Sequence, residues 1–168
     1  MNWKHRPLMA LAVLAALLPA PGSLTTASVF LKEDVRSLRQ ASESVVHAKV
    51  VDIRSYWNTA RSMIFTDVTL DVKGRLHGAS EDRMVVRVPG GTVADYTVEM
   101  QGAPEFEMDG EFVVFIGRWQ DGAAMVAGYF QGLSRIERDR LGNAMLRGGV
   151  ADGRALSDLA RELRQGAR

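Results

Sequence analysis

The segment 112–116 is apolar at every position, and this constrains the fold more than any other feature of the chain. It reads Phe-Val-Val-Phe-Ile, follows a turn at Met108–Gly110 and ends at Gly117. A short β-branched and aromatic run between turn signals predicts a β-strand. Because alternate side chains of a strand point to opposite faces, both faces of this strand must be buried. The rest of the chain therefore has to supply a cover for each face.

Five to seven strands are expected in total, joined by short turns. The longest, 63–76, alternates apolar residues with a polar set that includes Asp67 and Asp71, so one face lies inside and the other in water. Gly74 would allow this strand to bend or bulge. In the strand 45–53 neither face is purely apolar, which predicts a bulge within it. Asp121-Gly122 between apolar segments predicts a hairpin after the central strand.

Two amphipathic helices are expected to flank the strands. The first runs from Glu33 to about Ser42 and the second from about Arg154 to Arg164. They are the elements able to cover a strand with two apolar faces. We therefore predict a mainly β fold, a small closed or partly open antiparallel barrel of OB-like type, with both helices packed on one side.

Residues 1–27 have the pattern of a secretory signal peptide. A basic start is followed by an apolar run of eleven residues, Leu8–Leu18, which is shorter than the about 20 that span a bilayer. Cleavage is expected after Ala27, with Gly22 as the alternative, and residues 28–168 form one domain. The chain has no cysteine, so it is not a lipoprotein, and a periplasmic or secreted product is predicted.

Charge and composition favour no charged partner. The chain carries 21 basic and 20 acidic residues, and cleavage after Ala27 would leave 19 and 20. A near-neutral domain makes no electrostatic case for binding nucleic acid. Lys73, Arg75, Arg83 and Arg87 could form a basic face, but no aromatic residue is interleaved for stacking. No nucleic-acid partner and no cofactor are predicted, and a monomer is expected.

The order of elements and several turns resemble a group of uncharacterised exported bacterial proteins. The resemblance is carried by the helix and strand up to Ile53, the strand Phe65–Leu76, the turn Val88–Gly91, and Gly102–Phe106 followed by Gly110–Phe115. The layout is also similar to the netrin-like fold of tissue metalloproteinase inhibitors, an OB-type barrel with two terminal helices. Those inhibitors use an N-terminal cysteine on the target's zinc, which this chain lacks, so the resemblance implies architecture and not mechanism.

The residues that could perform catalysis form no recognised motif. His77 with Asp67 and Asp71 could serve a small metal-dependent or hydrolytic enzyme, and Ser134, His77 and Asp121 could be drawn as a triad. No HExxH, nucleophile elbow or P-loop is present. The three glutamates 105, 107 and 111 include a conceivable carboxylate pair. We predict no catalytic residue and no metal site, and regard Asp67 and Asp71 as part of a solvated strand face.

Aromatic residues in polar surroundings are the best candidates for recognition. Tyr56 and Trp57 are expected in a loop after the strand 45–53, and Trp119 in the Asp-Gly turn. Aromatic side chains on loops are favoured contact residues, although they also commonly close the end of a small barrel. The leading hypothesis is a non-enzymatic binding module in which Tyr56, Trp57 and Trp119 contact another exported protein, such as a protease. The small enzyme using His77 is the alternative.

Overall fold

The structure is a computed structural model that describes residues 31–165. The predicted signal peptide, residues 1–27, lies outside these residues. Among the described helices, none has the length and apolar character needed to cross a membrane. The elements are α1 (Val35–Ala41), β1 (Ser44–Trp57), β2 (Ile64–His77), β3 (Arg83–Pro89), β4 (Gly91–Val93), β5 (Tyr96–Val98), β6 (Glu111–Arg118), β7 (Ala124–Val126), η1 (Tyr129–Gly132), β8 (Leu133–Arg138), β9 (Ala144–Arg147), η2 (Gly149–Ala151) and α2 (Leu156–Gln165).

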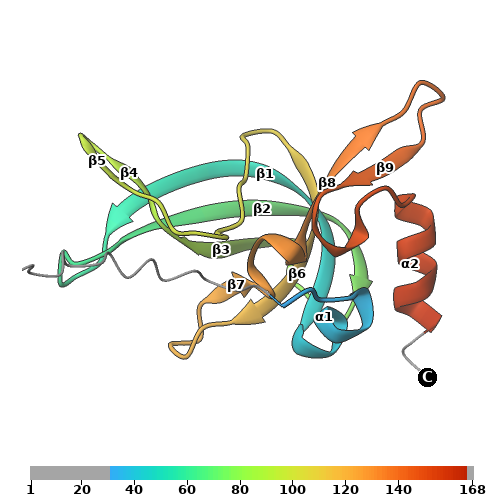
Figure 1. The fold of residues 1–168 in the computed structure, drawn as a ribbon, viewed down its shortest axis with the longest axis horizontal. Helices are drawn as coiled ribbons and strands as arrows, with labels where there is room; N and C mark the ends of the chain where they lie inside the picture. The colour runs from blue at the N-terminus through green and yellow to red at the C-terminus, as the bar shows by residue number, and fades with distance from the viewer. Residues whose placement is uncertain (1–30, 166–168) are drawn as a thin grey trace, which may run out of the picture.

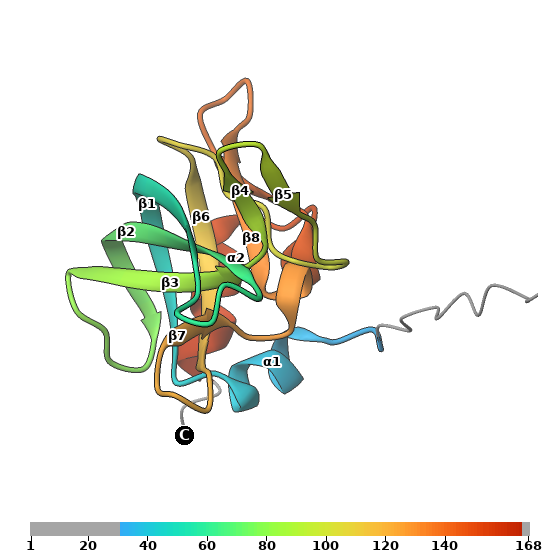
Figure 2. The same cartoon turned by 90° about the vertical axis from the view of Figure 1, so that its left-hand side faces the viewer.

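The fold is mainly β with two α-helices, as expected, and its largest sheet turns back on itself. That sheet has the order β1-β2-β3-β7-β6-β8-β9, and an additional β1–β6 pairing makes a ring of five strands: β1, β2, β3, β7 and β6. β8 and β9 extend from β6 as a hairpin, and β4 and β5 form a separate two-stranded hairpin. Figure 2 looks at the ring from the end near which β4 and β5 lie.

The prediction of an all-antiparallel arrangement is wrong at one position of the ring. β3 and β7 pair in parallel, through Val86 and Ala124 alone, whereas the other neighbours in the ring are antiparallel. The reason is geometric, because a ring with an odd number of strands cannot alternate direction at every step. The short β3–β7 contact is therefore the seam of the ring. The count of five to seven strands was also too low, since nine are formed within residues 31–165.

The two apolar faces of β6 are covered by two separate clusters, which confirms the prediction from its sequence. Phe112, Val114 and Ile116 join the cluster inside the ring. Val113 and Phe115 join a second cluster that contains residues of both helices, among them Leu38, Leu159 and Leu163. Both helices thus pack against the same outer side of β6 and β1, where Figure 1 places them.

The bulge predicted in β1 is present, and it explains the mixed pattern of that strand. The register with β2 shifts between Val50 and Asp52. Val50 before the shift and Ile53 after it therefore face the inside of the ring, although their spacing is odd. A second shift, between His47 and Ala48, lies beside the predicted bend at Gly74, which pairs with His47.

The prediction that Tyr56 and Trp57 lie in a loop is wrong, because both residues belong to a strand. β1 continues to Trp57, which pairs with Ile64 at the start of β2. The polar residues that suggested a loop are accommodated in the ladder, because the hydroxyls of Ser55 and Thr66 hydrogen-bond each other at 2.9 Å. Trp119 does lie in a turn, as predicted, closed by its own N–H donating to the carbonyl of Ala123 at 2.8 Å.

Candidate functional site

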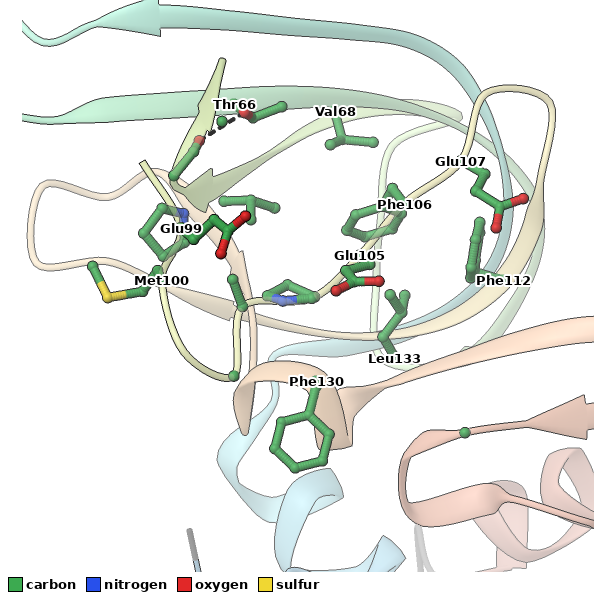
Figure 3. Close-up of a pocket in the computed structure, with 18 of the residues that line it drawn as sticks. Thr66, Val68, Glu99, Met100, Glu105, Phe106, Glu107, Phe112, Phe130 and Leu133 are labelled. Atoms are coloured by element: carbon green, nitrogen blue, oxygen red, sulfur yellow. Dashed lines mark hydrogen bonds between the residues drawn. The ribbon is translucent and has the colours of Figure 1, made fainter. Parts of the chain in front are cut away.

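A groove of about 970 Å³ opens at the margin of the inner cluster (Figure 3). On one side it is bounded by the inner faces of β2 and β3. The other side is formed by the irregular segment 99–107, which crosses between β5 and β6, and by η1, β8 and the start of η2. Residues from at least five parts of the chain thus meet around one concavity, which is where small ligands and peptide segments commonly bind.

The floor of the groove is apolar. Val68, Val88, Phe112 and Leu133 line it and also belong to the inner cluster. Phe106 projects from the segment 99–107 onto this floor and meets Phe112 edge to face, with ring centroids 5.3 Å apart (Figure 3). An edge-to-face pair adds about 0.5–1.5 kcal/mol to the burial of the rings. The floor is therefore part of a packed core and keeps its shape without a ligand.

The positive charges that line the groove already have partners. Arg135 forms an ion pair with Glu107, with Nη1 and Oε1 2.5 Å apart, and its guanidinium lies 6.0 Å from the ring centroid of Phe112. The hydrogen bond to Glu107 raises the pKa of Arg135 above its usual value. Arg147 lies 3.4 Å from a carboxylate oxygen of Glu137.

Two of the negative charges are not compensated in this way. Glu99 at the start of the segment 99–107 and Glu105 near its end line the groove and are exposed (Figure 3). Within residues 31–165, neither has a cationic partner within 4 Å. The groove therefore combines an apolar floor with two uncompensated carboxylates.

The structure brings Tyr56 and Trp119 together, but as parts of a network on the outer face of the ring. The Tyr56 hydroxyl donates to Asp67 at 3.0 Å and accepts from Nε of Arg87 at 3.1 Å. The Trp119 indole donates to the carbonyl of Arg87 at 3.4 Å, and Nη1 of Arg87 donates to Asp121 at 2.6 Å. Burial, followed by the hydrogen bond to Asp67, raises the pKa of Tyr56. This network ties the β6–β7 turn to β3 across the seam, which is a structural role.

Trp57 is separated from the other two aromatic residues. It follows Tyr56 in β1, so it points to the opposite face. There it meets Tyr96 of the β4–β5 hairpin edge to face, with ring centroids 5.8 Å apart. Trp57 is half-buried, whereas Tyr96 is 66% exposed. Trp57 packs against the β4–β5 hairpin. A contact residue on a loop would be surrounded by solvent, and Trp57 is not.

Replacing Trp57 by Ala is expected to lower the free energy of unfolding by about 1–2 kcal/mol, because a half-buried ring and one aromatic pair are lost. Urea unfolding measures the change, and Trp57→Phe, which keeps an aromatic ring against Tyr96, should lose less than half as much. A loss above about 4 kcal/mol would mean that Trp57 is a core plug. An unchanged stability would mean that the ring does not support the hairpin.

The residues of the hydrolytic alternative are not brought together. His77 lies six residues beyond Asp71 on the same strand, roughly 20 Å along it. Asp67 accepts the Tyr56 hydrogen bond, and Asp71 pairs with Lys73 at 2.7 Å. Burial, and then the charge of Arg39, lowers the pKa of His77. Among residues 31–165, no three histidine or carboxylate side chains gather closely enough to hold a metal ion.

The other catalytic combinations are also dispersed. Ser134 is buried and its hydroxyl donates to the carbonyl of Gly148 at 2.8 Å, while Asp121 is held by Arg87. Of the three glutamates, only the first two line the groove, since Glu111 pairs with His47 at 3.0 Å on the β1–β6 ladder outside it. The triad is therefore not assembled by the described side chains, whereas two of the three glutamates share the groove, where Glu107 is paired with Arg135.

The groove itself was missed by the sequence analysis. Of the residues 102–106, only Glu105 was considered as a site residue, within a conceivable carboxylate pair, and Phe106 carried no functional prediction. The signal that could have found it is Phe106 between Glu105 and Glu107, in a stretch with glycine and proline. A large apolar side chain in such a connection has to pack on a neighbouring surface, which here is the inner cluster.

No protein-family model, curated protein or solved structure matches this chain. The resemblance to exported bacterial proteins and to the netrin-like layout therefore stays a prediction. What the protein binds has to be inferred from the groove and from the charges around it.

Proposed function

We propose that this protein is an exported, non-enzymatic binding module whose groove holds a segment of another exported protein. The observation that carries the proposal is the groove of about 970 Å³, which has an apolar floor continuous with the core. Concave sites with an apolar lining and a few convergent polar groups are typical of ligand binding. A pre-formed floor also favours affinity, because little conformational entropy is lost when a ligand binds.

The proposal includes a finer description of the fold and of its place in the cell. The ring of five strands is proposed to be a small, partly open barrel of OB type, with the groove at its mouth and both helices on its outer side. The product would act as a monomer in the periplasm or outside the cell after cleavage at Ala27. The basic and apolar N-terminal pattern supports export, and the five-strand ring supports the barrel.

Site-specific photocross-linking tests whether the groove is the contact surface. A benzophenone side chain at Gln101, which is exposed and lines the groove, should cross-link the mature protein to a partner in the envelope fraction of its source bacterium. The matched control carries the same group at Gln120, which is exposed beside Trp119 on the outer face. We expect a cross-linked species from Gln101 and none from Gln120.

The two positions separate the competing contact surfaces. A product from Gln120 alone would move the contact to the Trp119 turn and overturn the groove as the binding site. Equal labelling from both positions would indicate non-specific collision. No product from Gln101 with the partner fraction in excess would also contradict the proposal.

A further inference from the structure

We infer that the groove binds an extended peptide segment in which a lysine or arginine has an apolar residue two positions away. This inference rests on the proposed function and names the class of its ligand. The peptide main chain would pair with the segment 103–107. The cationic head group would lie between the carboxylates of Glu99 and Glu105.

The first support is the backbone of the segment 103–107. Its ends are tied by the N–H of Ala103 to the carbonyl of Met100 at 3.0 Å, and by the N–H of Gly110 to the carbonyl of Glu107 at 3.0 Å. Between them Pro104 is buried, Glu105 is exposed and Phe106 is half-buried, an alternation typical of extended chain. The segment therefore lies like a strand along the groove without belonging to a sheet.

This strand-like segment has main-chain groups to offer. The N–H groups of Glu105, Phe106 and Glu107 donate to no other group within residues 31–165. An exposed row of donors and acceptors is the template to which an extended peptide adds as a further strand. Because consecutive N–H groups of an extended chain point to opposite sides, an added peptide would pair with one alternate set of these groups, whereas a compact small molecule would reach only one of them.

The second support is the balance of charge. The two arginines of the groove are neutralised by Glu107 and Glu137, so the uncompensated charge comes from Glu99 and Glu105. Complementary charge selects a cationic partner and disfavours an anionic one. The methylene stem of a lysine or arginine could lie along Phe106 while its head group reaches the carboxylates.

The third support is the apolar floor beside these carboxylates. In an extended peptide, residues two apart point to the same side. A cationic side chain between Glu99 and Glu105 would therefore bring a side chain two positions away toward Val68 and Val88. The expected pattern is apolar-x-basic or basic-x-apolar, and an apolar residue on both sides would use the floor most fully.

Fluorescence polarisation with a capped, labelled peptide Thr-Val-Thr-Arg-Thr-Val-Thr tests the charge preference on the mature chain. We expect it to bind at least tenfold more tightly than the same peptide with Gln or Glu in place of Arg. The double variant Glu99→Gln, Glu105→Gln should bind the Arg peptide no more tightly than the same variant binds the Gln peptide. The matched control Glu81→Gln, Glu162→Gln removes the same charge from exposed positions that do not line the groove and should bind as the unmodified protein does.

N-methylation tests the main-chain pairing. Only one of two alternate sets of peptide amides can face the segment 103–107. Methylation of one set should therefore weaken binding at least tenfold, and methylation of the other should leave it within about twofold. Equal losses, or none, would overturn the pairing. Spermidine that binds as tightly as the peptide would also overturn it, in favour of a small cation.

The outcomes distinguish this inference from the proposed function. If the three peptides bind equally and the groove variant changes nothing, the charge preference is wrong while the groove remains a binding site. If no peptide binds but Gln101 still cross-links to a partner, the peptide class is wrong and the proposed function stands. If the benzophenone at Gln101 forms no cross-link to a partner, the proposed function itself is overturned.

Discussion

Replacing Phe115 by Ala is expected to lower the free energy of unfolding by about 3–5 kcal/mol. Phe115 is fully buried in the cluster beneath the two helices, where it lies on the face of β6 opposite to the inside of the ring. Truncation removes the apolar contacts of the phenyl group and leaves a cavity that the packed strands cannot fill. Since most domains are stable by about 5–15 kcal/mol, this single change would remove at least about a fifth of the total.

Urea unfolding followed by far-ultraviolet circular dichroism measures this loss. Leu141→Ala is the matched control, because Leu141 is 86% exposed in the β8–β9 turn and its truncation should stay within about 0.5 kcal/mol. Phe115→Leu, which keeps most of the apolar volume, should fall between the two. A loss below about 1.5 kcal/mol for Phe115→Ala would mean that the helices do not cover a tightly packed face.

Ending the chain before Arg154 is expected to abolish soluble, folded protein. The deletion removes α2, whose Leu159 and Leu163 are fully buried against the outer cluster. Burial of one leucine contributes about 1.5–3 kcal/mol, so these two alone approach the stability of a small domain. The deletion also uncovers Val113, Phe115 and Leu146, a contiguous apolar surface that promotes aggregation.

The soluble fraction after expression of the mature chain measures this result. A control that ends at Gln165 keeps the whole of α2 and should be as soluble and as stable as the full chain. Any soluble portion of the shorter form should bind a dye such as ANS and unfold without cooperativity. A truncated protein that is soluble and unfolds cooperatively would contradict the role of α2 as a cover.

The alternation of residues along the chain was enough to predict much of the core. Val68 and Leu70 lie inside the ring, while Asp67 and Asp71 lie on the outer face, as their two-residue period indicated. The mixed pattern of β1 correctly predicted a bulge, because a shift of one residue exchanges the faces of a strand. The face on which a side chain lies and the position of a bulge depend on neighbouring residues in the chain, so a local sequence pattern is enough to predict them.

The candidate site was predicted less well, because it depends on contacts between distant segments. Tyr56 and Trp57 were correctly noticed as aromatic residues in polar surroundings, but their pairing with β2 made them strand residues on opposite faces. Glu99 and Phe106 belong to no motif in the sequence, and Glu105 was predicted only as part of a conceivable carboxylate pair. They line one groove because the connection between β5 and β6 crosses the inner faces of β2 and β3.

The sequence by itself determined that an apolar strand at 112–116 needs two covers, that the helices provide one of them, and where the strands 45–53 and 63–76 begin to within one residue. The tertiary structure decided that the ring closes through the parallel contact of Val86 and Ala124, and that the groove lies where the segment 99–107 meets β2 and β3. The physical reason is that side-chain periodicity follows from the local geometry of one strand. Ring closure and the position of a groove follow from pairings between remote strands, which no local pattern specifies.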